Sequence, residues 1–286
     1  MGVAIVTDST AYLRPERIEA APVPIHVVPL HVVIAGQQYR EGVDVSVEDL
    51  AAALRAFRPV STSMPAPADF LEVYEQAVAE GADEIVSVHL SAEMSGTVTG
   101  ARLAAQQASV PVHVVDSRTL GMAMGYAVLS AAEAAAAGAS GEACAAVARS
   151  RATKSFLVFC VDTLEYLRRG GRIGSASALL GSALAIKPIL ALKEGHIEPV
   201  EKVRTASRAL VRMVDLAVAF AEGAHAEVDV TVQHLDSAVR AQSTVDALRA
   251  RIPAAREIGV AELGAVIGAH VGPGTLAVVV SPVVPV

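Results

Sequence analysis

Residues 84–107 read EIVSVHLSAEMSGTVTGARLAAQQ, and this stretch decides the fold. Its first part, Glu84 to Leu90, is an apolar run of strand length rich in Ile and Val, and the part from Thr97 onward has helix-forming composition. Between them, Ser95, Gly96 and Thr97 could direct backbone N–H groups, hydroxyls and the positive end of the helix dipole toward an anion. Because Ser and Thr are also common helix caps that need no ligand, both interpretations stay open.

The chain on either side of this stretch alternates helices and strands. We expect helices at 69–80, 97–108 and 120–137 and strands at 84–90 and 112–116. Such alternation predicts a parallel sheet with helices on both faces.

Polar residues follow several of the predicted strands. The first strand, 3–6, delivers Thr7 to Thr10 to its carboxyl end, which is the edge where Ser95 and Asp116-Ser117 would also emerge. We therefore expect one crevice to collect these side chains. In the alternative interpretation, Asp8 or Ser9 only caps a short helix.

The length of 286 residues exceeds that of a usual single domain, so we expect two. An Ala-rich segment ends near residue 152, and strands and helices alternate again after it. The prediction is an α/β protein with an N-terminal domain at 1–152, whose parallel sheet is flanked by helices, and a C-terminal α/β domain at 153–286.

Composition excludes several classes of function. A net charge of −7, the absence of Trp and an aromatic content of 3% argue against nucleic-acid binding. No apolar run reaches the length of a membrane span, and the start MGVAIVTDST lacks a signal peptide, so we expect a cytoplasmic protein. Cys144 and Cys160 lie in apolar sequence and are predicted to be buried core thiols.

Two further segments carry candidate binding residues. The segment RPVSTSMPAP, residues 58–67, holds three prolines and is predicted to be a loop, in which Ser61, Thr62 and Ser63 could shape turns or offer hydroxyls to a ligand. His270 is flanked by glycines in the predicted turn 268–274, where it could be structural or functional.

Few kinds of chemistry fit these residues. Ser95 lacks the GxSxG pattern of a nucleophile elbow, His pairs at metal-binding spacing are absent, and no nucleotide-binding loop occurs, so no cofactor is expected. A polar pocket of hydroxyls, backbone amides and one His could hold the carboxylate of a fatty acid. The apolar interior beside it could hold the acyl chain, since each buried methylene contributes about 0.8 kcal/mol to the binding free energy. The alternative is a serine hydrolase or acyltransferase that uses Ser95 and His270, and a third possibility is a regulator or scaffold without lipid.

Taken together, several segments resemble the DegV family. They are VTDST, STSMP, LSAEMSGT, VVDS, VDTLEYLRRGGRIG, KPIL, GHIEPVEKVRT and GAHVGPGTL, and they span nearly the whole chain in the family's order. Members are bacterial fatty-acid-binding proteins, and some are the acyl carrier subunit of a fatty acid kinase. The resemblance implies two α/β domains with the acyl chain buried at or near their interface.

The resemblance also implies roles for individual residues. The carboxylate would be held by Thr62, Ser63, Ser95, Gly96 and His270. Two basic residues, Arg172 and Arg204, match positions near the head group or the face that meets a separate dihydroxyacetone-kinase-like fatty acid kinase, which would form the acyl phosphate. Transient membrane contact is a further implication.

This sequence departs from the family pattern close to the proposed head group. Met64 replaces the usual Gln, Ala66 replaces the usual Ser, and Ala92-Glu93 replaces a Ser-rich approach to the Ser95 turn. These differences concern the hydrogen-bond network and the preferred chain length of the fatty acid.

Overall fold

The computed structural model describes residues 2–179 and 186–285. The chain forms two compact units, of which the first comprises Met1–His31, Ser63–Lys154 and Val284–Val286 and the second Val32–Thr62 and Ser155–Val283. The change of unit after Lys154 lies close to residue 152. The predicted division kept residues 32–62 with the N-terminal part of the chain, whereas their contacts are with the C-terminal part.

The first unit contains a four-stranded sheet in the order β2-β1-β6-β7, in which all neighbouring strands are parallel. Its strands are β1 (Val3–Asp8), β2 (Ile25–Val28), β6 (Glu84–His89) and β7 (Val112–Asp116). The predicted parallel sheet is therefore confirmed.

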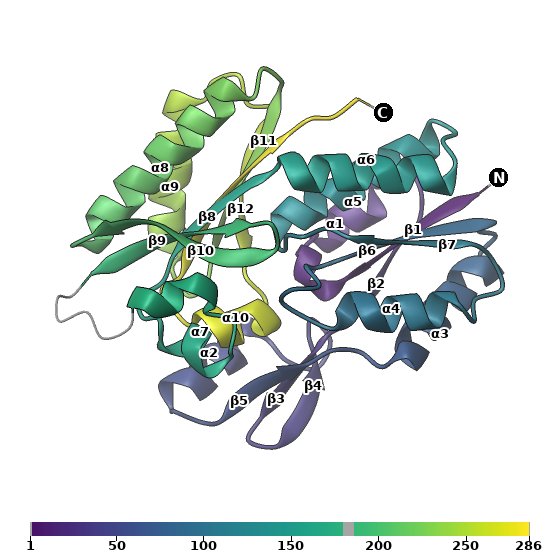
Figure 1. Cartoon of the computed structure of the whole chain (residues 1–286), viewed down its shortest axis with the longest axis horizontal. Helices are drawn as coiled ribbons and strands as arrows, with labels where there is room; N and C mark the ends of the chain where they lie inside the picture. Colours follow the sequence, from purple (N-terminus) through teal and green to yellow (C-terminus); the bar gives the residue numbers. More distant parts are fainter. Residues whose placement is uncertain (1, 180–185, 286) are drawn as a thin grey trace. The chain divides into compact units, whose positions relative to one another are not determined.

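Helices cover both faces of this sheet, as the alternating pattern predicts (Figure 1). One face carries α3 and α4, and the other carries α5 and α6. The helices are α1 (Pro15–Glu19), α3 (Pro67–Ala79), α4 (Thr97–Ala105), α5 (Met122–Ala136) and α6 (Gly141–Lys154), with a 3-10 turn η1 (Ser9–Ala11) after β1. Phe70 and Tyr74 of α3 pack with Ala101 of α4 in the core between the helices and the sheet.

The second unit is built on a six-stranded sheet in the order β10-β9-β8-β13-β11-β12. Only the pair β11–β12 is parallel, and the other neighbours are antiparallel. Its strands are β8 (Phe156–Cys160), β9 (Lys187–Lys193), β10 (His196–Val203), β11 (Val228–His234), β12 (Glu257–Glu262) and β13 (Leu276–Pro282).

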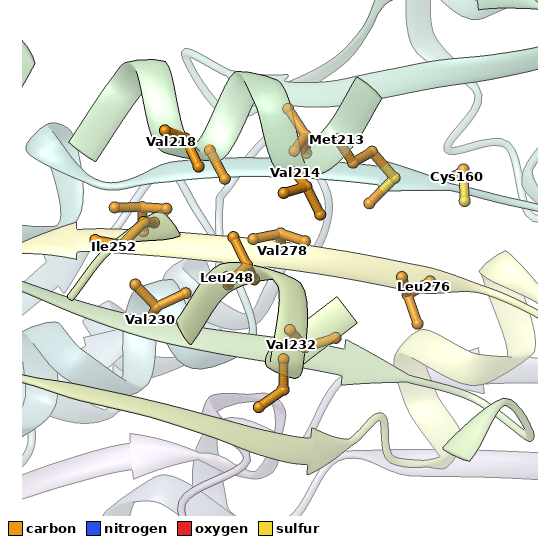
Figure 2. Packing of buried hydrophobic residues seen from close by; sticks show 14 of the residues in the cluster. Cys160, Met213, Val214, Val218, Val230, Val232, Leu248, Ile252, Leu276 and Val278 are labelled. Carbon is orange, nitrogen blue, oxygen red and sulfur yellow. The ribbon is translucent and has the colours of Figure 1, made fainter. Parts of the chain in front are cut away.

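Apolar side chains of two helices and this sheet form a hydrophobic core of the second unit (Figure 2). Met213 of α8 and Leu248 of α9 pack with Val278 of β13. Cys160 lies in the same core, and burial raises its pKa to about 11, while Cys144 is buried in the first unit. The helices of the second unit are α2 (Val47–Arg55), α7 (Glu165–Arg169), α8 (Ala206–Gly223), α9 (Ala238–Arg251) and α10 (Ala265–Val271), with a 3-10 helix η2 (Gly174–Leu179).

A small third sheet has the order β4-β3-β5, with β3 (His31–Ile34), β4 (Gln37–Arg40) and β5 (Val60–Ser63). The prediction of a loop at 58–67 was wrong for β5. The strand fits between Pro59 and Pro65, and its alternating Val60 and Thr62 have the β-branched side chains that favour extended backbone.

His270 lies on helix α10, so its predicted place in a glycine-rich turn was wrong. Gly268 does not end the helix but lets it pack closely on α2. A Cβ atom at this position would lie 2.6 Å from Leu50 Cδ2. The helix ends at Gly272, whose φ of 76° is a conformation that favours glycine.

Candidate functional site

The second unit contains a cavity of about 870 Å³, which is within the range of small-molecule sites. It is lined by residues of β3, β5, the end of α2, α7 and α10. Its lining joins apolar groups such as Val60 and Tyr166 to a polar cluster that includes Thr62, Arg172 and His270. The structure therefore brings three of the predicted residues to one cavity.

Thr62 and His270 form a direct hydrogen bond. Thr62 Oγ1 lies 2.8 Å from His270 Nε2, although the residues are 208 positions apart in the sequence. The other ring nitrogen, Nδ1, is shielded from solvent and has no hydrogen-bond partner among the described residues. This imidazole is therefore held by one edge only.

Gly170 closes the second edge of the imidazole. A Cβ atom at this position would lie 2.1 Å from His270 Nδ1, so only glycine allows the C-terminal end of α7 to approach the ring. The Gly170 carbonyl accepts a hydrogen bond of 2.7 Å from Arg172 Nη1. This hydrogen bond holds the guanidinium next to Gly170, on the same wall of the cavity as His270. The sequence Gly170-Gly171-Arg172 thus shapes the wall of the cavity next to His270.

Burial and, as the smaller cause, the nearby Arg172 cation together lower the pKa of His270 to about 4. At neutral pH the ring is uncharged. A neutral imidazole has one N–H donor and one acceptor nitrogen, so its hydrogen bond to Thr62 can run in either direction.

Sequence reasoning missed other residues of the cavity. Phe57 is 85% exposed just after α2, and Arg58 follows it. Tyr166 and Arg169 come from α7, where Arg168 and Arg169 hold the pKa of Glu165 down to about 2. The only available signal was the aromatic and basic composition of EYLRR, which does not distinguish a cavity wall from a solvated helix.

The Ser95 turn lies in the first unit, between β6 and α4. Gly96 is the N-cap residue and makes no side-chain hydrogen bond, so Ser95 is not the helix cap. Ser95 Oγ instead lies 2.8 Å from Thr97 Oγ1. The simple capping interpretation of Ser95 was therefore wrong.

Every backbone N–H group from Leu90 to Ser95 has an acceptor within the first unit. The acceptors are Asp8 Oδ2 for Leu90, the Thr119 carbonyl for Ser91, Asp116 Oδ1 for Ala92, Ser91 Oγ for Glu93 and the Ser91 carbonyl for Met94 and Ser95. By contrast, no hydrogen bond within residues 2–179 and 186–285 uses the N–H groups of Gly96, Thr97 or Val98. These three N–H groups at the N-terminus of α4 are therefore available as hydrogen-bond donors to an anion.

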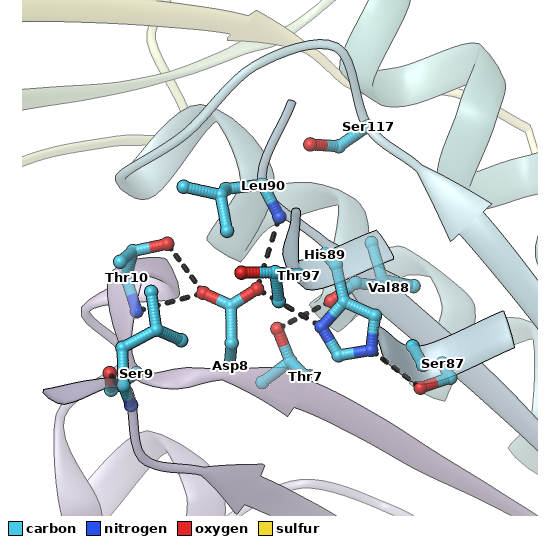
Figure 3. A network of polar contacts seen from close by, with 12 residues as sticks. Thr7, Asp8, Ser9, Thr10, Ser87, Val88, His89, Leu90, Thr97 and Ser117 are labelled. Atoms are coloured by element: carbon cyan, nitrogen blue, oxygen red, sulfur yellow. Dashed lines mark hydrogen bonds and ion pairs between the residues drawn. The ribbon is translucent and has the colours of Figure 1, made fainter. Parts of the chain in front are cut away.

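A second polar cluster lies at the ends of β1 and β6 and is fully buried (Figure 3). Asp8 accepts hydrogen bonds from Thr10 N and Oγ1, from Leu90 N and from His89 Nδ1. His89 Nε2 lies 2.7 Å from Ser87 Oγ, which lies 2.8 Å from the Tyr74 hydroxyl. Burial raises the pKa of Tyr74 to about 12, so its hydroxyl stays protonated.

This cluster bears on the two interpretations of Thr7 to Thr10. Asp8 caps the 3-10 turn, and the side chain of Ser9 accepts a hydrogen bond from Leu30 N. Ser117 is also buried and donates to the Thr119 carbonyl. The side chains of Thr7 to Thr10 and of Ser117 thus have hydrogen-bond partners within the first unit, and the crevice expected at this edge stays a prediction.

The remaining predicted residues lie outside the cavity lining. Ser63 is exposed at the end of β5, and Arg204 is exposed just after β10. Within the described ranges, no cluster of three His, Cys, Asp or Glu side chains could hold a metal ion, and no helix is both long and apolar enough to cross a membrane.

The structure gives the hydrolase alternative no support. A serine nucleophile needs a base within hydrogen-bonding distance of its hydroxyl. The hydroxyl partner of Ser95 is Thr97, and that of His270 is Thr62. Although Asp8, His89 and Ser87 are connected like a catalytic triad, they are completely buried and no substrate could reach Ser87.

The model of the DegV family of uncharacterised proteins matches residues 2–283. A DegV domain-containing protein of Streptomyces coelicolor is 52% identical over 279 residues, which cover 98% of each chain. The chain therefore belongs to the DegV family.

Solved structures of DegV proteins share the fold. A DegV family protein from Thermus thermophilus, described as fatty acid binding, is 36% identical with a TM-score of 0.90, and the match covers 99% of this chain and 100% of that one. DegV from Bacillus subtilis, described as a fatty acid binding protein, is 32% identical with the same TM-score and the same coverage. These likenesses confirm the predicted family and α/β fold.

Proposed function

We propose that this DegV-family chain binds a long-chain fatty acid and presents its carboxylate to a separate kinase. The observation that carries the proposal is the Thr62–His270 hydrogen bond on the wall of the cavity, with one imidazole nitrogen left unpaired. It is supported by the solved relatives from Thermus thermophilus and Bacillus subtilis that are described as fatty acid binding.

The protonation of His270 suits a carboxylate ligand. When Nε2–H donates to Thr62 Oγ1, the hydroxyl of Thr62 is free to donate its own proton to a ligand. Arg172, which lowers the pKa of His270, adds positive charge near the head group. Such hydrogen bonds and a nearby cation keep a fatty acid ionised in a partly buried site. Apolar side chains of the same cavity offer surface to the methylenes next to the head group.

We include Ser95 and Gly96 in the carboxylate site because the turn leaves the N–H groups of Gly96 to Val98 unused. Free amides and the positive end of a helix dipole favour an anion. Ser63 is included on the family resemblance alone.

The second step of the proposed function takes place on another protein. A dihydroxyacetone-kinase-like fatty acid kinase would transfer the γ-phosphoryl group of ATP to a carboxylate oxygen, which forms the acyl phosphate and releases ADP. Arg172 and Arg204 would contact the head group or the kinase. With this kinase and ATP, hydroxylamine trapping of the acyl phosphate should show slower formation for Arg204→Ala at unchanged lipid affinity.

Native mass spectrometry tests the binding step. The protein purified from a bacterial host should carry one fatty acid, which organic extraction then identifies. His270→Asn should weaken palmitate and oleate binding by about tenfold, since a buried donor is lost. The matched control is His225→Asn, because His225 is exposed with a φ of 50° that Asn tolerates. A wild-type protein that stays free of lipid after incubation with both acids would refute the proposal.

A further inference from the structure

The loop from Leu90 to Ser95 has no regular structure, yet it carries the turn that we assign to the head group. Its position is fixed by hydrogen bonds to the last residues of β1 and β7. Asp8 accepts from Leu90 N, and Asp116 accepts from Ala92 N. The loop is therefore held by one carboxylate on each side.

Asp116 is the more accessible of the two carboxylates. It is the last residue of β7 and is half-buried, whereas Asp8 is completely buried. Asp116 Oδ1 accepts from Ala92 N at 3.2 Å and from Arg118 N at 2.9 Å, so the same oxygen joins the two loops.

Backbone contacts beside Asp116 complete the junction between these loops. Ser91 N donates to the Thr119 carbonyl at 2.8 Å, and Ser117 N donates to the His89 carbonyl at 3.0 Å. The Ala92 amide, which lies between these two backbone contacts and the Ser95 turn, is bound by the side chain of Asp116. Loss of the Asp116 side chain would leave the Ala92 amide without this acceptor, while the backbone contacts of Ser91 and Ser117 stay in place.

The Ser91 carbonyl connects the position of the Ala92 loop to the Ser95–Gly96 turn. It accepts from Met94 N at 3.0 Å and from Ser95 N at 3.1 Å. Ala92 lies inside this short loop, so its position sets the direction from which Ser95 and Gly96 enter α4.

From these contacts we propose that Asp116 is a positioning residue that fixes the Ser95–Gly96 turn in its ligand-binding geometry. The proposal rests on the proposed function, because the turn is assigned there to the carboxylate. Asp116 does not touch the ligand itself. It acts through the Ala92 amide.

The conservative variant separates positioning from charge. Both bonds of Asp116 use one oxygen as the acceptor of a backbone N–H, and Asn keeps such an oxygen. Asp116→Ala should therefore weaken palmitate binding by about fivefold to tenfold, and Asp116→Asn should restore it to within about twofold of the wild type. Equal losses in the two variants would overturn the proposal.

Asp83 provides a matched control in the same unit. It is exposed at the other end of the sheet, where its carboxylate accepts a backbone hydrogen bond of 2.8 Å from Gly2 N. Asp83→Ala loses a comparable hydrogen bond, but at the end of the sheet opposite to the Ser95 turn. The palmitate affinity of this variant should therefore equal that of the wild type. An affinity loss as large as that of Asp116→Ala would assign the effect to general destabilisation and overturn the proposal.

A double-mutant cycle tests the path through Ser95. If Asp116 works by placing the turn, then Asp116→Ala should weaken binding much less in the Ser95→Ala background than in the wild type. Additive effects of the two substitutions would contradict this path.

Hydrogen exchange separates failure of this inference from failure of the proposed function. In the ligand-free protein, Asp116→Ala should speed the amide exchange of residues 92–98, and Asp83→Ala should leave it unchanged. Unchanged exchange in Asp116→Ala overturns the positioning role whether or not the protein binds lipid. Faster exchange in a protein that binds no fatty acid would refute the proposed function. Asp116 would then only anchor the loop, and its proposed role in ligand binding would be overturned as well.

Discussion

His89 and His270 are both hydrogen-bonded to hydroxyl groups, yet their surroundings differ. His89 is completely buried, and its two ring nitrogens contact Asp8 and Ser87. His270 lines a cavity, contacts Thr62 through one nitrogen and leaves the other unpaired. A fully satisfied buried network stabilises a fold, whereas the Thr62 hydroxyl on the cavity wall, paired with one His270 nitrogen, can make a further hydrogen bond to a ligand. A hydroxyl partner alone therefore does not distinguish a structural histidine from a binding histidine. The distinction depends on whether the hydrogen-bonded pair is buried in a closed network or lines a cavity.

The largest expected effect is on the stability of the buried network. His89→Ala removes the ring that joins Asp8 to Ser87 and opens a cavity beside Phe70, whose ring packs edge-on against His89. We expect the free energy of unfolding to fall by about 3 to 5 kcal/mol. Urea denaturation followed by circular dichroism measures this loss. His270→Ala should cost less than half as much, and equal losses would break the comparison.

The second prediction concerns the pH dependence of stability. His270 has a pKa of about 4 in the folded protein, compared with an ordinary value of 6.5. Below about pH 6.5 the unfolded chain binds a proton that the folded protein does not, so stability falls with decreasing pH until about pH 4. This lowering of the His270 pKa corresponds to a loss of stability of roughly 3 kcal/mol between the two pH values.

Replacement of His270 isolates this contribution. Urea unfolding at pH 7 and pH 4.5 should show a smaller loss of stability for His270→Gln than for the wild type. The control His225→Asn should behave like the wild type, because His225 is exposed. Parallel pH profiles for the wild type and His270→Gln would show that the imidazole does not titrate as its surroundings require.

The third prediction alters the wall beside His270. Gly170→Ala places a Cβ atom against His270 Nδ1, at 2.1 Å in the present geometry, so the ring must move away from Thr62. Palmitate affinity, measured by calorimetry, should fall by about tenfold to a hundredfold, since a displaced donor leaves the carboxylate poorly paired.

Gly171→Ala is the matched control for this substitution. Gly171 has a φ of 70° but no atom within 4 Å of an added Cβ. The strained backbone should lower stability by about 1 kcal/mol without a change in lipid affinity. If both alanine variants bind palmitate equally, the position of His270 does not control binding.

The sequence predicted the parallel sheet well because its signals are local. The strand at 84–90 and the helix from Thr97 each have a clear composition, and they appear as β6 and α4. His89 and Ser87 were not recognised as a network. A signal existed, since they alternate on one face of an otherwise apolar strand, but their partners lie on other elements, Tyr74 on α3 and Asp8 at the end of β1, 81 positions from His89.

The cavity was harder to predict because its walls come from distant segments. Residues 32–62 fold with the second unit, and β5 is too short and too rich in hydroxyls to resemble a strand in isolation. Gly268 suggested a turn, yet it allows α10 to pack on Leu50. In each case a tertiary contact decided a local conformation that composition left open.

The smallest expected effect concerns the hydroxyl of Thr62. Thr62→Val keeps the shape of the side chain but leaves His270 Nε2 without its partner and removes a donor that we assign to the ligand. Palmitate affinity should fall by roughly 1 kcal/mol, or about fivefold, and Thr62→Ser should restore most of it because the hydroxyl returns. Calorimetry of the three proteins measures the change. Should Thr62→Val lower stability and leave affinity unchanged, the Thr62–His270 pair would be structural in the same sense as Ser87–His89, and its place on the cavity wall would no longer identify a binding histidine.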